Sequence, residues 1–260
     1  FGSLPSNGDI EIPSRHLGLV QAADLAASGA LEPMIDKAAE LVAAHLDLGT
    51  IEAAFAGIAA PETGPDLLPP PGQRIAIARD AAFGFSYEHL IAGWRDAGAE
   101  IMNFSPLADE APPPNADFIF LPGGYPELHL PELSRAGNFL GGLRAAAERG
   151  TRIYGECGGY MVLGETIIDA EGASYPMAGL LALETSFANR KLHLGYRRMT
   201  PLAQAWPGLE PVTGHEFHYT SATRAEGDPL FAVSDAAGHG LGTMGLVRGS
   251  VAGSYAHIIA

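Results

Sequence analysis

The sequence predicts an α/β protein with a mostly parallel sheet flanked by helices and a short helical appendage at its N-terminal end. Three observations support this fold class. From residue 74 onwards, short apolar segments alternate with segments of helical length, the pattern of parallel strands joined by helical crossovers. Glycine-rich turns follow two of the apolar segments, where ligands of such sheets bind. The single cysteine, Cys157, lies in the second of these turns.

Composition excludes several classes of function. The chain has 260 residues, 47% of them hydrophobic, which is enough for a sizeable core. With 15 Lys and Arg against 30 Asp and Glu, the net charge of −15 argues against nucleic acid or an anionic membrane as the main partner. One cysteine excludes an internal disulfide framework and a cysteine cluster for zinc. Without a membrane-spanning run or a signal peptide, we expect a cytoplasmic protein.

The first 73 residues predict a domain tail and a linker. Because the chain begins at Phe1 without an initiator Met, we expect a fragment of a longer protein. Apolar residues at helical spacing predict a helix that ends at Gly49 and a second helix, capped by Thr50, through Phe55. Two such helices cannot cover each other's apolar faces, so we interpret residues 1–58 as the end of a preceding domain. Residues 59–73 are too rich in proline for a helix or central strand and predict a semi-rigid linker.

The elements of the main domain, residues 74–260, follow in order. A buried strand is expected at 75–78, and the helix after it at 86–97 has Tyr87, Leu90, Ile91 and Trp94 on one face. Further strands are expected at 100–104, 117–121 and 151–155, with a helix at 140–148 before the last of them. The final hundred residues are less regular. They contain candidate β segments at 192–199, 215–221 and 245–247 and end on an apolar, strand-like tail.

The segment 152–164 predicts a strand, a sharp turn and a helix, with Cys157 at the apex. A thiol there lies at the N-terminal end of a helix, which favours the thiolate. Gly158 leaves its N–H open towards a carbonyl group, and the turn at Gly123 and Gly124 could supply the other half of an oxyanion hole. That second turn lacks the lysine and Ser/Thr of a phosphate-binding loop. A lone cysteine is usually a small buried apolar residue, but the flanking glycines favour a nucleophile here.

A cysteine nucleophile needs a base, usually a histidine. Of nine histidines, His257 is preferred because it follows a strand-like tail that should end at the carboxyl edge of the sheet. His215 and His218 flank a glutamate and invite a metal interpretation. A strand would put these two histidines on opposite faces, so we expect no metal site and prefer a polar lining or hydrogen-bonding role.

Four motifs together carry a resemblance to a known family. They are Leu-Pro-Gly-Gly-Tyr-Pro-Glu at 121–127, Tyr-Gly-Glu-Cys-Gly-Gly-Tyr-Met at 154–161, Gly-His-Glu-Phe-His-Tyr at 214–219 and Gly-Ser-Tyr-Ala-His at 253–257. Over residues 73–260 the chain resembles the glutaminase domain of the cobyrinic and hydrogenobyrinic acid a,c-diamide synthases. Those are class I glutamine amidotransferases with a flavodoxin-like fold. Residues 13–20 resemble the end of the ATP-dependent synthetase domain of the same family.

The resemblance implies a mechanism and partners. Cys157 would attack the side-chain amide of L-glutamine to give a glutamyl thioester and ammonia, and His257 would shuttle the proton. Oxyanion and glutamine binding would fall to Gly123, Gly124, Tyr125 and Gly158. The ammonia would reach the missing synthetase domain, where ATP and Mg²⁺ activate the a and c carboxylates of a corrinoid acceptor. No cofactor or metal is expected in this fragment, nor any nucleic acid or membrane partner, and a homodimer stays open.

The sequence also departs from the pattern. Ile259 stands two residues after His257, where many class I amidotransferases have glutamate and this family more often has a second histidine. The chain stops at Ala260, where we expect further residues. The alternatives left open are the glutaminase of a cobyric acid synthase or of a complex amidating cell-wall lipid precursors. A cysteine hydrolase acting on another amide and a non-catalytic α/β binding module also remain.

Overall fold

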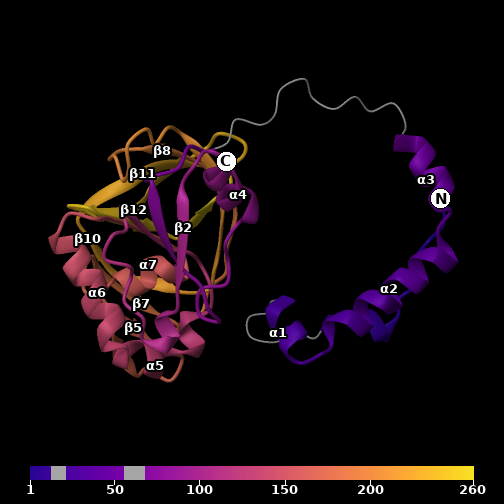
Figure 1. Cartoon of the computed structure of the whole chain (residues 1–260), viewed down its shortest axis with the longest axis horizontal. Coiled ribbons are helices and arrows are strands. Elements are labelled where there is room, and N and C mark those ends of the chain that lie inside the picture. Colours follow the sequence, from indigo (N-terminus) through magenta and orange to yellow (C-terminus); the bar gives the residue numbers. More distant parts are fainter. Residues whose placement is uncertain (13–21, 56–67) are drawn as a thin grey trace. The chain divides into compact units, whose positions relative to one another are not determined.

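The computed structural model describes residues 1–12, 22–55 and 68–260 (Figure 1). The chain divides into two compact units, Phe1–Pro65 and Asp66–Ala260. The segment that resembles a synthetase end, 13–20, and most of the predicted linker lie outside the described residues. In the part of the chain that is described, no helix is both long and apolar enough to cross a lipid bilayer.

The described part of the first unit contains a 3-10 turn and three helices, namely η1 (Gly8–Ile10), α1 (Ala22–Ala27), α2 (Leu31–His45) and α3 (Leu48–Phe55). Two predicted details are wrong here, because α2 ends before Gly49 and Thr50 lies inside α3. The cap is Asp47, whose carboxylate accepts hydrogen bonds from the N–H and the hydroxyl of Thr50 at 3.0 and 2.6 Å. None of the residues of α2 is buried, and Phe55 of α3 is 65% exposed.

The second unit contains the α/β part of the chain. Its helices are α4 (Glu88–Asp96), α5 (Leu130–Arg135), α6 (Gly137–Glu148) and α7 (Gly158–Leu163), with 3-10 turns η3 (Pro106–Ala108) and η4 (Pro126–Leu128). Its strands are β1 (Arg74–Ala78), β2 (Glu100–Phe104), β3 (Phe118–Leu121), β4 (Arg152–Glu156), β5 (Thr166–Ile168), β6 (Ser174–Pro176), β7 (Ala182–Ser186), β8 (His193–Pro201), β9 (Val212–His218), β10 (Ser221–Glu226), β11 (Asp228–Ser234), β12 (Gly240–Arg248), β13 (Val251–Ser254) and β14 (Ala256–Ile258).

Ten strands form one mixed sheet in the order β14-β9-β8-β11-β12-β13-β4-β3-β1-β2. The α/β fold class is confirmed. Half of the sheet, from β13 to β2, is parallel, and the other half pairs antiparallel, so "mostly parallel" describes the first half only. The reason is the connections. An α-helix separates β1 from β2, and two separate β3 from β4, which permits parallel pairing, whereas the antiparallel neighbours β8 and β9, β11 and β12, and β12 and β13 are joined by loops without an α-helix.

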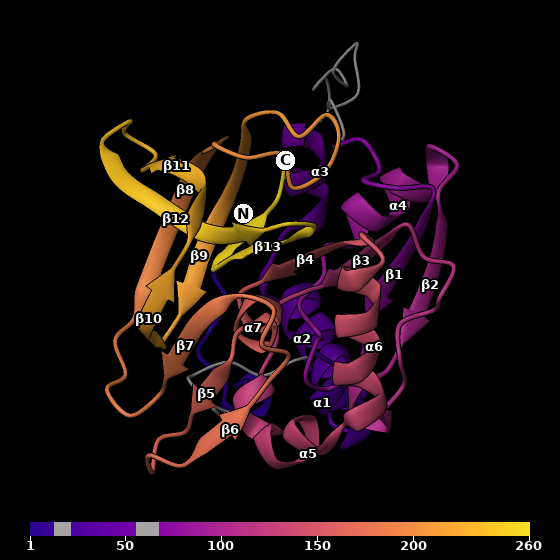
Figure 2. The same ribbon diagram turned by 90° about the vertical axis from the view of Figure 1, so that its left-hand side faces the viewer.

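Two apolar layers cover the faces of this sheet. One layer contains Leu133, Phe139 and Leu143 from α5 and α6, packed on Ile119 and Ile153 of β3 and β4. Figure 2 shows α6 in front of the parallel strands. The opposite layer contains Leu90, Ile91 and Trp94 of α4, the face predicted from their spacing. A second sheet, in the order β10-β7-β5-β6, extends the first layer.

The predicted strands and helices of residues 74–155 are all present within a few residues of the expected bounds. The segment 215–221 is divided, because β9 ends at His218 in the large sheet and β10 begins at Ser221 in the small one. The short elements β5, β6, β7, β11 and α5 were not predicted. Strands of three to seven residues between turns carry too few side chains to show a clear period.

Candidate active site

Cys157 stands at a strained turn between β4 and α7. Its backbone has φ 47° and ψ −107°, and among the described residues only Asp109 shares a positive φ without being glycine. The Cys157 N–H donates to the carbonyl of Ser254 at 2.9 Å, which joins the turn to the end of β13. A Cβ on Gly159 would overlap the carbonyl of Leu121, so glycine is required where α7 passes β3. The expected strand, turn and helix are therefore present.

The thiol itself is buried. Cys157 is 4% exposed, and its Sγ donates a weak hydrogen bond to the carbonyl of Phe217 at 3.8 Å. Burial raises the pKa of the Cys157 thiol, with the negative charge of Glu127 second, and the N–H of Gly158 opposes this only in part. The expectation that the helix end favours the thiolate is wrong, because desolvation outweighs the backbone dipole. The thiol requires a base to become a nucleophile.

The second glycine turn lies against the first. An ideal Cβ on Gly158 would be 3.2 Å from the Gly124 nitrogen and 2.7 Å from Cδ of Pro126. The carbonyl of Gly123 accepts a hydrogen bond of 2.9 Å from the N–H of Phe85, which holds the turn in place. Tyr125 is buried with its ring edge-on to Phe85. The fold therefore brings Gly124 and Gly158 together at the carboxyl ends of β3 and β4.

His257 lies on β14, which follows β13 after one residue. It pairs with His215 of β9, and the two rings are stacked with centroids 4.8 Å apart. A Cβ on Gly123 would overlap Cε1 of His257, so the ring rests against the glycine turn. Burial lowers the pKa of His257 to about 3, with the charges of His215 and His218 as further causes. The imidazole is neutral at physiological pH and can accept a proton.

Glu156, the residue before the nucleophile, was not selected from the sequence. Its side chain is 4% exposed, with Oε1 accepting the Ile258 N–H at 3.0 Å and Oε2 3.9 Å from Nδ1 of His257. Burial raises the pKa of Glu156 to about 8, only partly offset by that hydrogen bond. A carboxyl group at the end of a buried strand was the sequence signal that could have identified it.

Tyr87 also belongs to this neighbourhood, although the sequence indicated only a packing role in α4. Its hydroxyl shares a hydrogen bond with Nε2 of His215, and its ring meets that of His257 edge-on with centroids 6.5 Å apart. Burial raises the pKa of Tyr87 to about 12, and the charges of Glu156 and Cys157 contribute. Tyr87, His215 and His257 thus form one continuous group of rings.

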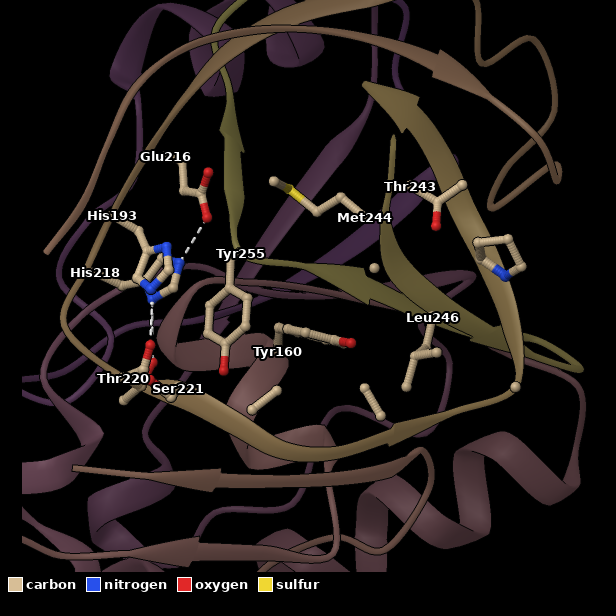
Figure 3. A pocket seen from close by; sticks show the side chains of 15 residues that line it. Tyr160, His193, Glu216, His218, Thr220, Ser221, Thr243, Met244, Leu246 and Tyr255 are labelled. Atoms are coloured by element: carbon tan, nitrogen blue, oxygen red, sulfur yellow. Dashed lines mark hydrogen bonds and ion pairs between the residues drawn. The ribbon is translucent and has the colours of Figure 1, made fainter. Parts of the chain in front are cut away.

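A pocket of about 520 Å³ with a mixed polar and apolar lining lies beside the nucleophile turn (Figure 3). Tyr160 of α7 and Tyr255, between β13 and β14, line it together with His193, Glu216 and His218. As expected for a strand, His215 and His218 are on opposite faces of β9: one stacks on His257 and the other faces this pocket.

The three groups His193, Glu216 and His218 place one potential ligand atom each within 4.8 Å of the others, the one such cluster among the described residues. Glu216 is already used, because Oε2 pairs with Arg197 at 2.7 Å and Oε1 with Nε2 of His218 at 2.8 Å. The rings of His193 and His218 are stacked within 6° of parallel. Parallel stacked rings cannot both point a lone pair at one ion, so a hydrogen-bonded lining fits better than a metal centre.

A cysteine at a strained, glycine-flanked strand-to-helix turn, with a second glycine turn and a neutral histidine at the same end of the sheet, is the arrangement expected of an α/β domain for thiol-dependent acyl transfer. The family model of the CobB/CobQ-like glutamine amidotransferase domain matches residues 74–260, and the chain belongs to that family.

Curated relatives extend the match to the whole chain. The hydrogenobyrinate a,c-diamide synthase of Rhizobium meliloti (strain 1021) is 53% identical over 260 residues, which are 100% of this chain and 59% of the relative. The synthase of the same name from Rhodobacter capsulatus is 49% identical over 263 residues, with the same coverage. The chain thus spans 59% of the length of these relatives. Among solved structures, PurLQS from Thermotoga maritima is similar with a TM-score of 0.46 and 16% identity, over 72% of this chain and 87% of that one.

Proposed function

We propose that this chain is the glutaminase part of a hydrogenobyrinate a,c-diamide synthase. The observation that carries the proposal is the turn at Cys157, held at φ 47° and bonded through its N–H to Ser254, three residues before His257. A strained turn of this kind holds a nucleophile at the edge of the sheet, and β14 brings a neutral imidazole to the same edge.

The proposed reaction uses this chain's own residues. His257 removes the thiol proton of Cys157, and Sγ attacks the side-chain amide carbon of glutamine. The N–H groups of Gly124 and Gly158 hold the oxyanion, with Gly123 and Tyr125 shaping the turn. His257 then protonates the leaving amide nitrogen, which departs as ammonia, and water hydrolyses the glutamyl thioester to glutamate and the free thiol.

For the longer protein we propose that ammonia amidates the a and c carboxylates of hydrogenobyrinic acid. The printed names of the relatives support this acceptor. We assign residues 1–58 to the end of a synthetase domain, 59–73 to a linker and 74–260 to the glutaminase, and the family match over 74–260 supports the last boundary. We further propose that the protein works in the cytoplasm, which its single cysteine supports.

We propose that ATP and Mg²⁺ bind to the synthetase part of the longer protein and not to this chain. The glycine turn at Gly123 and Gly124 has no lysine, serine or threonine beside it that could hold phosphate oxygens and a metal ion. The residues of the site therefore do not fit a nucleotide, and no step described above passes through one.

The test is ammonia release from L-glutamine by the purified chain, compared with Cys157→Ala, His257→Ala and, as a matched histidine control, the exposed His239→Ala. We expect turnover to vanish without Cys157, to fall at least 100-fold without His257 and to stay unchanged in the control. No turnover even after a separately produced N-terminal part of a synthase is added would reject the glutaminase.

A further inference from the structure

Glu156 has no role in the mechanism above, although it is buried beside the proposed base. Its carboxyl group points into the apolar layer that contains Tyr154, Trp206 and Ile258 rather than to solvent. Burying an ionisable group in such a setting is costly, so the position calls for a function.

The His257 ring is fixed on several sides, which identifies the nitrogen that Glu156 faces. His215 covers one face of the ring, and Gly123 abuts the Cε1 edge. Nδ1 is buried without a hydrogen-bond partner, and Oε2 of Glu156 is 3.9 Å from it. Catalytic hydrogen bonds are often long before substrate binds, and a shift of about 1 Å closes this gap.

We propose that Glu156 is the positioning residue of His257: it accepts a hydrogen bond from Nδ1–H and so keeps Nε2 unprotonated, as the base that takes the thiol proton of Cys157. This rests on the proposed glutaminase function. Many class I amidotransferases supply a carboxylate two residues after the base, but here Ile259 stands at that place. The carboxyl group would come instead from the last residue of β4, directly before the nucleophile turn.

The backbone makes this arrangement specific for a carboxylate. The Ile258 N–H holds Oε1 at 3.0 Å, which directs the second oxygen towards His257. In Glu156→Gln the amide carbonyl would take the Ile258 bond, leaving the NH₂ group facing Nδ1. An NH₂ group can only donate, so Nδ1 would have to accept and the ring proton would move to Nε2, which abolishes the base.

The decisive measurement is the tautomer of His257 from the ring ¹⁵N shifts in the wild-type chain and in Glu156→Gln. It is made at about pH 9, where Glu156, with its pKa of about 8, is ionised and can only accept. The other titratable groups near it, Tyr87, Tyr154 and Cys157, all have raised pKa values, and His257 stays neutral. We expect the proton on Nδ1 in the wild type and on Nε2 in the variant.

Kinetics provide the second readout. At about pH 9, where the wild-type Glu156 is ionised, we expect Glu156→Gln to lower kcat for glutamine hydrolysis by about 10³-fold with KM within twofold, because binding groups are untouched while the base has the wrong tautomer. Glu165→Gln, a partly exposed carboxyl paired with Arg224, is the matched control and should change neither quantity.

These outcomes separate the two proposals. A wild-type ring protonated on Nε2, or a folded Glu156→Gln variant with unchanged kcat, overturns the role of Glu156. The wild-type tautomer decides the question even if the variant fails to fold. Absence of turnover in the wild type counts against the glutaminase, while the tautomer still tests the contact.

Discussion

The imidazole rings of His215 and His257 are stacked within 7° of parallel, with centroids 4.8 Å apart, in directly paired positions of β9 and β14. The stack places one histidine against the face of the other and lowers the pKa of His257 in addition to the larger effect of burial. The hydroxyl of Tyr87, the residue before α4, shares a hydrogen bond with Nε2 of His215, so the orientation of the proposed base depends on this segment as well as on the sheet.

Replacing His215 with Phe tests this relationship. Phe keeps the stack but cannot become charged, so we expect the pKa of His257 to rise while staying below 6.5, since burial remains the main cause. A pH titration of the His257 ring by NMR measures it. His239→Phe, at an exposed position, is the control and should leave the pKa unchanged. A lower or unaltered pKa in His215→Phe would contradict the contribution of that ring.

Gly123→Ala tests whether the ring requires the glycine turn. The new Cβ would overlap Cε1 of His257. We expect glutaminase activity to fall about 100-fold or more, because small displacements of a catalytic group have effects of this size. Gly141→Ala in α6 is the control. Its Cβ meets open space, so activity should stay and stability should rise by up to about 1 kcal/mol. An active Gly123→Ala enzyme would show that the ring can be accommodated elsewhere.

The strain at Cys157 predicts that, of two inactive variants, Cys157→Gly is more stable than Cys157→Ala. Cys157→Gly relieves the φ of 47°, whereas Cys157→Ala removes the sulfur and keeps the strain. After allowing for the greater chain entropy of glycine, we expect Cys157→Gly to exceed Cys157→Ala in free energy of unfolding by about 1 kcal/mol. Urea denaturation of the two variants compares them directly. Equal midpoints would mean that the turn carries no net strain.

Glu156 should make the protein less stable as the pH rises. The folded carboxyl has a pKa of about 8 and the unfolded one about 4.5, so the folded state holds the extra proton between these values and loses that advantage from pH 4.5 to 8. Each unit of difference corresponds to about 1.4 kcal/mol. We therefore expect the Tm of the wild type to fall relative to Glu156→Gln between pH 5 and 8. A constant difference in Tm across this range would contradict the raised pKa.

The ion pair of Arg197 with Glu216 should matter far more than an exposed one. Both side chains are largely buried, and Glu216 also binds His218. Burial raises the pKa of Glu216, but the hydrogen bonds and charges of His218 and Arg197 outweigh it and hold the pKa below its usual value. Arg197→Met should cost about 3 kcal/mol or more, because it leaves a buried charge without its cation. Arg74→Met, which removes the exposed pair with Asp117, should lower the free energy of unfolding far less, because water screens that pair. Similar losses in thermal unfolding would contradict the distinction.

The sequence by itself determined the four strands and two of the three α-helices of residues 74–155, and the turn at Cys157. Parallel strands buried on both faces have short runs of apolar residues, and a turn with unusual backbone angles requires glycines around it. Both features can therefore be recognised in the local sequence. The same logic put His215 and His218 on opposite faces of a strand. The motifs also pointed to the family that the comparisons found.

Only the tertiary structure decided how these residues meet. Strand order and the antiparallel half of the sheet depend on pairings between distant segments, which no local period encodes. The contact of Glu156 with His257 joins two strands that are not hydrogen-bonded neighbours, and the stack of His257 on His215 arises from the register of β14 with β9. The raised pKa of Cys157 had the same origin, because desolvation is a property of everything packed around a group. Burial therefore reversed the protonation that the nucleophile turn predicted on its own.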